Sequence, residues 1–146
     1  NEILIPCKHM MSTVDTPIAL HIRRGDFLIN SANHHNLDFD YYESCLDKFD
    51  QKRNVIIFSD DTQWCKEQKI FSDDRFLVAE DNDNYTDLCL MSLCSDFIIA
   101  NSTFSWWGAW ISKSLDKTVY APKKWFGVNN KHLNTSDLIP NEWIVI

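Results

Sequence analysis

Two adjacent arginines, Arg23 and Arg24, are the side chains of this sequence best suited to bind an anion. They follow an apolar run at residues 18–22 that Pro17 and Gly25 bracket, which is too short for a helix and contains β-branched residues typical of a buried strand. Ligands bind at the carboxyl edge of open α/β sheets, and guanidinium groups match the geometry of phosphate oxygens. We therefore predict that a strand ends here in a phosphate site.

Plainer interpretations of the arginine pair stay open on this stretch alone. Exposed charge is the default for arginine, so the pair can be solvated surface. Residues 24–26 also spell RGD, a cell-adhesion tripeptide, although three-residue matches arise by chance and need a confirming context.

A second candidate anion site follows a predicted strand at residues 96–100. Asn101, Ser102, Thr103 and Ser105 mark the turn into a helix, whose free N–H groups and dipole attract anions. An ordinary N-cap followed by a core helix explains the same pattern. The chain has only three glycines, which excludes a G-x-G-x-x-G loop and a P-loop. Phosphate must then be held by arginines and a helix start.

Carboxylates also fall at the predicted ligand edge. Asp60 and Asp61 follow a strand at residues 54–59 and could accept hydrogen bonds from a ribose or a guanine, or one of them caps the helix predicted at residues 62–68. Both interpretations stay open.

Two further groups suggest metal ligands, and neither is favoured. Asp81 and Asp83 form a D-x-D pair after a strand at residues 75–79, but acidic residues before a helix complement its dipole in any case. His34 and His35 lie in a predicted polar loop, and adjacent side chains diverge rather than share a metal.

Strands alternate with helical patterns along the chain, which indicates an α/β fold with a parallel sheet. The periodicity predicts a helix capped by Asp40, and Trp125 and Trp143 are either core residues or part of an interface. The remaining predicted elements are a loop at residues 28–38, a helix at 85–94, a strand at 118–122 and a strand or packing segment at 143–146.

Composition limits the partners of the chain. Its 146 residues and 45% hydrophobic content suit one domain with a real core, and no apolar run approaches the length of a membrane span. The net charge of −7 argues against nucleic acid or an anionic membrane as the main partner. Five cysteines without a C-x-x-C pair suggest buried residues in a reducing compartment, whereas sequons at Asn84, Asn101 and Asn134 point weakly the other way.

Together, these stretches closely resemble the carboxyl-terminal, donor-binding half of the α-1,2-fucosyltransferases of glycosyltransferase family 11. Residues 21–27 are similar to the family's H-x-R-R-x-D motif, and residues 101–110 look like its later donor-site motif. The resemblance covers residues 17–146, and the combined pattern is more specific than either half. Other matches in the family's order are Tyr41 and Tyr42, Ser59 to Asp61 with Trp64 and Cys65, and Asp87, Leu88, Leu90, Met91 and Cys94.

The resemblance implies the Rossmann-like, nucleotide-binding half of a GT-B glycosyltransferase. Residues 17–146 would be a GDP-fucose-binding domain and residues 1–16 a linker from a missing N-terminal half, since the chain begins with Asn rather than Met. The implied reaction is a metal-independent, inverting transfer of fucose to the 2-hydroxyl of a galactose-terminated glycan. We expect a cytoplasmic, bacterial enzyme, with membrane association of the full-length protein as a further expectation.

The resemblance also implies roles for individual residues. Arg23 would hold the β-phosphate as GDP departs, Asp26 would position the arginines, and Arg24 would serve either the diphosphate or the fold. A general base is not identified, so the alternative is a nucleotide-sugar-binding module that is not catalytic on its own. The expected donor-binding residues are His21, Arg23, Arg24, Asp60, Asp61, Ser102, Thr103, Phe104 and Ser105.

Overall fold

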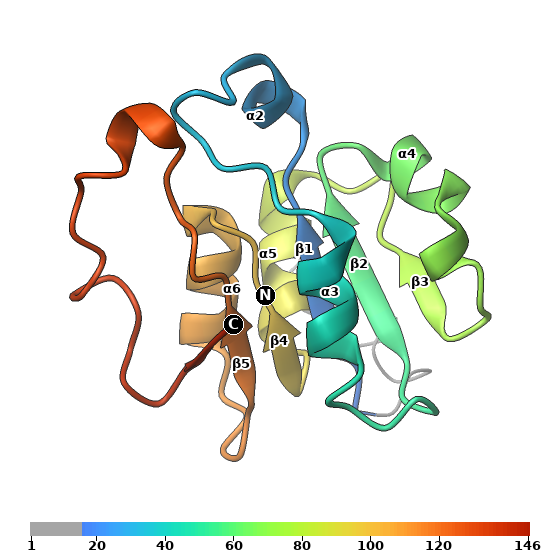
Figure 1. Cartoon of the computed structure of the whole chain (residues 1–146). Helices are drawn as coiled ribbons and strands as arrows, with labels where there is room; N and C mark the ends of the chain where they lie inside the picture. Colours follow the sequence, from blue (N-terminus) through green and yellow to red (C-terminus); the bar gives the residue numbers. More distant parts are fainter. Residues whose placement is uncertain (1–15) are drawn as a thin grey trace.

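The computed structural model describes residues 16–146, so nearly all of the predicted linker and Cys7 lie outside the described residues. A single six-stranded sheet has the order β3-β2-β1-β4-β5-β6, and its neighbouring strands are all parallel (Figure 1). This confirms the predicted α/β, Rossmann-like class. The strands are β1 Ile18–Ile22, β2 Val55–Ser59, β3 Phe76–Val78, β4 Asp96–Ile98, β5 Val119–Ala121 and β6 Ile144–Val145.

Helices cover both faces of the sheet. In Figure 1, α3 lies in front of the strands, whereas α5 and α6 lie behind them. The helices are α2 Gly25–Ile29, α3 Phe39–Leu46, α4 Thr62–Glu67, α5 Asn84–Ser92 and α6 Thr103–Ile111, with short 3₁₀ turns η1 Lys69–Phe71 and η2 Val128–Asn130.

Strand β1 is buried along its whole length and separates two core clusters. Ile18, Leu20 and Ile22 belong to the cluster under α3, whereas Ala19 belongs to the cluster under α5 and α6. Successive side chains of a strand point to opposite faces. This alternation carries past the end of the strand and sends the next side chains toward different faces of the sheet.

Two sequence predictions near the ligand edge are wrong. The predicted loop at residues 28–38 begins inside helix α2, because Leu28 N donates to Arg24 O at 2.8 Å and Asn30 N donates to Asp26 O. Helix α3 begins two residues earlier than predicted. Its N-cap is Asp38 rather than Asp40, since the extended Asp38 accepts a hydrogen bond from Tyr41 N.

An ion pair ties the strands together at the opposite, amino-terminal edge of the sheet. Arg53 donates to Asp96 Oδ2 at 2.6 Å, to Ser95 Oγ and to Thr16 O, while Asp96 Oδ1 accepts from Thr118 N. This group links the segments that enter β1, β2, β4 and β5.

Several residues whose role the sequence left open belong to the core. Trp125 is 8% exposed and Trp143 6%, and both pack into the cluster under α5 and α6. Burial raises the pKa of the Cys45 and Cys94 thiols to about 12, so they are inert core groups. Within residues 16–146, no helix combines the length and the apolarity that crossing a bilayer requires.

Candidate functional site

The loop after β1, residues 23–26, carries both arginines and is called the arginine loop here. Arg23 Nε and Nη2 donate to Asp26 Oδ1 at 3.0 and 2.7 Å, and Arg23 Nε lies 3.4 Å from Asp60 Oδ2. Asp60 Oδ1 also accepts from the backbone N–H of Arg24 at 2.9 Å. The carboxylates of Asp26 and Asp60 therefore fix the position of Arg23.

Gly25 permits this close packing of carboxylate and loop. A Cβ atom at position 25 would lie 2.6 Å from Asp60 Oδ2, which is closer than real Cβ contacts. A larger residue would push Asp60 away from the arginine loop. Gly25, which follows the predicted strand, thus allows the Asp60 carboxylate to lie against the arginine loop.

Arg24 points toward the α4 side of the sheet. Its Cζ atom lies 3.7 Å from the ring centre of Trp64, and its Nε donates to Asp61 Oδ2 at 3.2 Å. Asp61 Oδ1 also accepts from Trp64 N, which confirms the predicted helix cap. Arg24 is therefore fixed on a cation–π contact and an ion pair.

A hollow of about 90 Å³ opens on the α5 and α6 side of the arginine loop. We call it the His21 hollow, and it brings together His21, Arg23, Asp60 and Phe104 from the predicted site. Its other lining residues are Phe58, Ser59, Asn84 and Asp87.

His21 is 4% exposed, and within residues 16–146 its Nδ1 atom has no hydrogen-bond partner. Its ring lies 5.4 Å from that of Phe104. Burial, and secondarily the charge of Arg23, lower the pKa of His21 to about 3. The imidazole is therefore neutral at physiological pH and offers a nitrogen that a ligand can satisfy.

Asp87 is a residue of the His21 hollow that the sequence analysis placed in no binding role. It lies in the first turn of α5 and accepts from Asn82 Nδ2 at 3.0 Å. Burial raises the pKa of its carboxyl group. In the sequence analysis Asp87 appears only among the further matches to the family's order.

The residues of the second predicted anion site, at the start of α6, have different roles in the structure. Ser102 caps the helix by accepting from Phe104 N, and Thr103 is exposed. The Ser105 hydroxyl is buried and donates to Ala100 O and Ser102 O, so it lies inside the helix–sheet contact rather than in the His21 hollow.

Asn101, which precedes α6, connects the loop between α2 and α3 to the segment after β5. Its Nδ2 donates to His35 O at 2.8 Å and to Trp125 O at 2.7 Å, and the residue is 4% exposed. Beside this link, His34 stacks on Phe27 with ring centres 4.2 Å apart. The Asn101 side chain of this sequon is therefore buried and has a structural role.

One of the candidate metal ligands, Asp83, has a structural role. Asp83 caps α5 by accepting from Thr86 N at 2.7 Å, and this hydrogen bond lowers its pKa, so Asp83 complements the helix start as its D-x-D interpretation predicted. In the part of the chain that the structure describes, no group of three or more His, Cys, Asp or Glu side chains is placed to share a metal ion.

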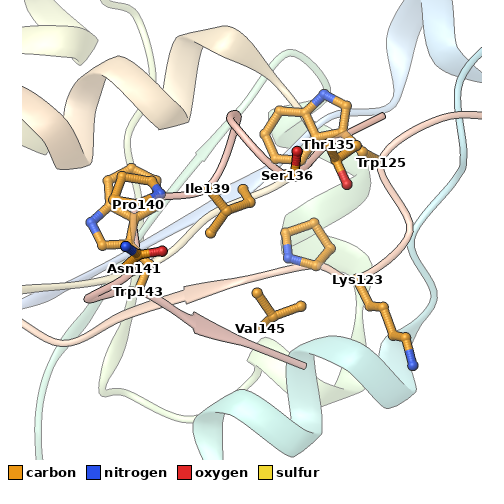
Figure 2. A pocket seen from close by; sticks show the side chains of 10 residues that line it. Lys123, Trp125, Thr135, Ser136, Ile139, Pro140, Asn141, Trp143 and Val145 are labelled. Atoms are coloured by element: carbon orange, nitrogen blue, oxygen red, sulfur yellow. The ribbon is translucent and has the colours of Figure 1, made fainter. Parts of the chain in front are cut away.

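Two other hollows lie outside the His21 hollow. One, of about 230 Å³, lies on the α3 and α4 side of the arginine loop and is called the Trp64 hollow. The other, of about 360 Å³, lies beneath the C-terminal segment, where Figure 2 shows Trp125, Ile139 and Trp143 around it. Arg23 lines both the His21 hollow and the Trp64 hollow.

The fold and the site together define a class of protein. A parallel, Rossmann-like sheet with a cationic loop at its carboxyl edge is consistent with the nucleotide-sugar-binding domain of a GT-B glycosyltransferase. The family model "Glycosyl transferase family 11" matches residues 5–146, and the chain belongs to that family.

Curated relatives come from Escherichia coli. The chain is 40% identical to "O-antigen biosynthesis glycosyltransferase WbnK" over 99% of this chain and 49% of the relative, and 38% identical to an "Alpha-1,2-colitosyltransferase" over 88% and 47%. The chain thus spans about half the length of the curated relatives it matches. No solved structure matches it significantly.

Proposed function

We propose that this chain is the donor-binding part of an α-1,2-fucosyltransferase. It would bind GDP-fucose and transfer fucose, with inversion, to the 2-hydroxyl of a galactose-terminated glycan. The observation that carries the proposal is the position of Arg23, a guanidinium held by two carboxylates between two hollows at the ligand edge. Its family and the α-1,2 linkage in one relative's name support the linkage type.

Arg23 would act on the leaving group. The acceptor oxygen attacks the anomeric carbon, the bond from that carbon to the β-phosphate oxygen breaks, and GDP leaves with the electron pair. A cation fixed beside the β-phosphate stabilises the charge that develops there. Asp26 and Asp60 fix the guanidinium before the substrate arrives, so little reorganisation is needed.

The His21 hollow would receive the guanine. A carboxylate such as that of Asp87 can accept both from the ring N1–H and from the 2-amino group, while the free nitrogen of the neutral His21 can meet a polar edge of the base. The sequence analysis named Asp60 and Asp61 as candidates for this contact. Asp60 accepts from the backbone N–H of Arg24, and Asp61 accepts from Arg24 Nε and from Trp64 N at the α4 cap. We therefore assign base recognition to Asp87.

The wider proposal concerns cofactor, partners and location. We propose that the transfer needs no metal, because the arginine loop supplies the positive charge that the diphosphate requires. We place the base that takes the acceptor's proton in the portion of the relatives' length that this chain does not span. We propose a bacterial cytoplasmic enzyme, with membrane association arising in the full-length protein.

A second candidate is a nucleotide-sugar-binding module without catalysis of its own. The observation in its favour is that the chain covers 49% and 47% of the two relatives. Both candidates bind donor, and turnover separates them.

Calorimetric titration with GDP, ADP and GDP-fucose, each with magnesium and with a chelator, tests the proposal. We expect GDP and GDP-fucose to bind equally well in both conditions and ADP to bind at least tenfold more weakly, since adenine lacks the donors that Asp87 accepts. Asp87→Asn should remove that preference, and the exposed Tyr85→Ala on the same helix turn should not. Absence of GDP binding to the folded chain would refute donor binding, and release of GDP with a β-galactoside present would refute the module without catalysis.

A further inference from the structure

The Trp64 hollow is a second recess beside the arginine loop. It is lined chiefly by Arg23, Arg24, Leu28, Asn36, Leu37 and Trp64. Because Arg23 also lines the His21 hollow, a group bound to Arg23 lies at the junction of the two recesses. In a nucleotide sugar, the diphosphate joins a nucleoside on one side to a sugar on the other. The two hollows, with Arg23 between them, follow the same order.

The walls of the Trp64 hollow are mainly apolar. Ile22, Leu28, Leu37 and Phe39 contribute aliphatic and aromatic surface. Leu28 is 46% exposed, so it lies at the mouth rather than in the core. Such a wall accepts a methyl group and disfavours an unpaired hydroxyl.

A free polar atom lies among these apolar groups. The side-chain oxygen of Asn36 is buried, and within residues 16–146 it has no hydrogen-bond partner. A buried acceptor without a donor is costly, and such an atom in a recess calls for a ligand group that donates to it. A sugar hydroxyl supplies that donor.

The aromatic wall is poorly suited to a nucleobase. Arg24 covers the Trp64 ring at 3.7 Å, and Phe39 lies parallel to the same ring with a centre-to-centre distance of 5.5 Å. Since protein groups already stack on the indole, little of its surface remains for a flat base.

We propose that the Trp64 hollow binds the sugar ring of the donor, with the 6-methyl group of fucose against Leu28 and Leu37 and a ring hydroxyl donating to Asn36 Oδ1. This assignment rests on the proposed function, because it takes GDP-fucose as the donor. It makes Leu28 and Asn36 determinants of which sugar is accepted. The base and the diphosphate remain with the His21 hollow and Arg23.

A matched pair of ligands tests the assignment without any substitution. GDP-L-galactose differs from GDP-fucose only by a hydroxyl at C6 of the sugar. By calorimetry or competition against a fluorescent GDP analogue, we expect GDP-fucose to bind about tenfold or more tightly than GDP-L-galactose, since an apolar pocket discriminates against an added hydroxyl by on the order of 10 to 100-fold. Equal binding of the two would overturn the assignment of the methyl group.

Two variants then locate the determinant. Leu28→Ser should reduce the preference for GDP-fucose at least threefold, whereas Ile29→Ser, the next residue and 91% exposed, should leave it unchanged. Asn36→Ala should weaken GDP-fucose about fivefold, as expected for one hydrogen bond, with Ser31→Ala as the control in the same loop. GDP alone should bind all four variants as it binds the unaltered chain.

The outcomes separate this inference from the proposed function. If GDP binds, Leu28→Ser leaves the ratio of the two GDP-sugars unchanged and Asn36→Ala leaves the affinity for GDP-fucose unchanged, the sugar lies elsewhere while donor binding stands. If GDP itself fails to bind the unaltered, folded chain, the proposed function falls and this inference falls with it. A variant that loses GDP affinity together with sugar preference contradicts a role confined to the sugar.

Discussion

Arg23 and Arg53 lie at opposite edges of the same sheet, and both pair with carboxylates at 2.6–2.7 Å. Arg53 divides its donors among Asp96, Ser95 and Thr16, all of them parts of the protein. Its guanidinium therefore links the segments at the amino-terminal edge of the sheet.

Arg23 is held differently. Its Nε and Nη2 atoms converge on one oxygen of Asp26, and the side chain lines two hollows. The ion pair fixes the guanidinium without enclosing it. The same chemistry thus makes a structural clasp at Arg53, where Nε and Nη2 donate to protein groups, and a binding group at Arg23, where the side chain lines two hollows.

We expect the largest effect on GDP affinity at Arg23, the arginine whose side chain lines two hollows. Arg23→Ala should lower GDP affinity by on the order of 100-fold or more, because a fixed cation beside a phosphate is lost. Calorimetry measures the affinity, and urea unfolding should show a change below about 1 kcal/mol, since the pair with Asp26 is exposed. If stability fell and affinity held, Arg23 would be a clasp like Arg53.

Arg53 should show the reverse pattern, with a large effect on stability and a small effect on GDP affinity. Arg53→Ala should reduce the free energy of unfolding by about 2–3 kcal/mol, because Asp96, whose side chain is 12% exposed, loses its partner. GDP affinity should stay within twofold. Urea unfolding checks the first result, with the exposed neighbour Lys52→Ala as control. Loss of GDP affinity in a folded Arg53→Ala chain would contradict the division of roles between the edges.

The sequence predicted this comparison only in part. Strands that alternate with helical patterns were enough to predict the parallel sheet, and polar residues at strand ends put Arg23, Asp26 and Asp60 at one edge. They could not separate Asp38 from Asp40 as a cap, because both precede the same apolar pattern and only backbone geometry decides.

Contacts between distant segments were beyond the sequence. Arg24 stacks on Trp64 across 40 positions of chain, and Asn101 joins residues 35 and 125 through one side-chain amide. Local propensity contains no term for such pairings, since they depend on how complete elements pack. The role of Arg24 in the fold became visible only with Trp64 and Asp61 in place.

His21, near the carboxyl edge of the sheet, should make the stability of the chain depend on pH. The unfolded His21 has the ordinary pKa of 6.5 and the folded one a pKa of about 3, so between these values the unfolded state binds the proton. Stability is then present above pH 6.5 and lost as pH falls toward 3, by about 2 kcal/mol between pH 7 and pH 5. Urea unfolding at several pH values measures this loss.

The variant His21→Gln isolates the histidine contribution to that loss. It should flatten the dependence of stability on pH between 7 and 5, whereas His35→Gln, a less buried histidine whose pKa is also lowered, should flatten it less. An unchanged slope in His21→Gln would mean that the imidazole is not held neutral beside Arg23.

The smallest effect concerns Arg24, the arginine between the two patterns. Asp61→Asn keeps an oxygen to cap α4 and removes the charge that pairs with Arg24, so stability should change by less than about 1 kcal/mol. Because the contact with Trp64 still holds the guanidinium, we expect GDP affinity within about twofold.

Asp60→Asn is the matched substitution one residue earlier, and it should cost more affinity, since Asp60 contacts both Arg23 and the backbone of Arg24. A tenfold loss of GDP affinity in Asp61→Asn would instead make Arg24 a second phosphate ligand that Asp61 positions. Arg24 would then bind the ligand together with Arg23, and only the carboxylates at this edge would have a purely structural role.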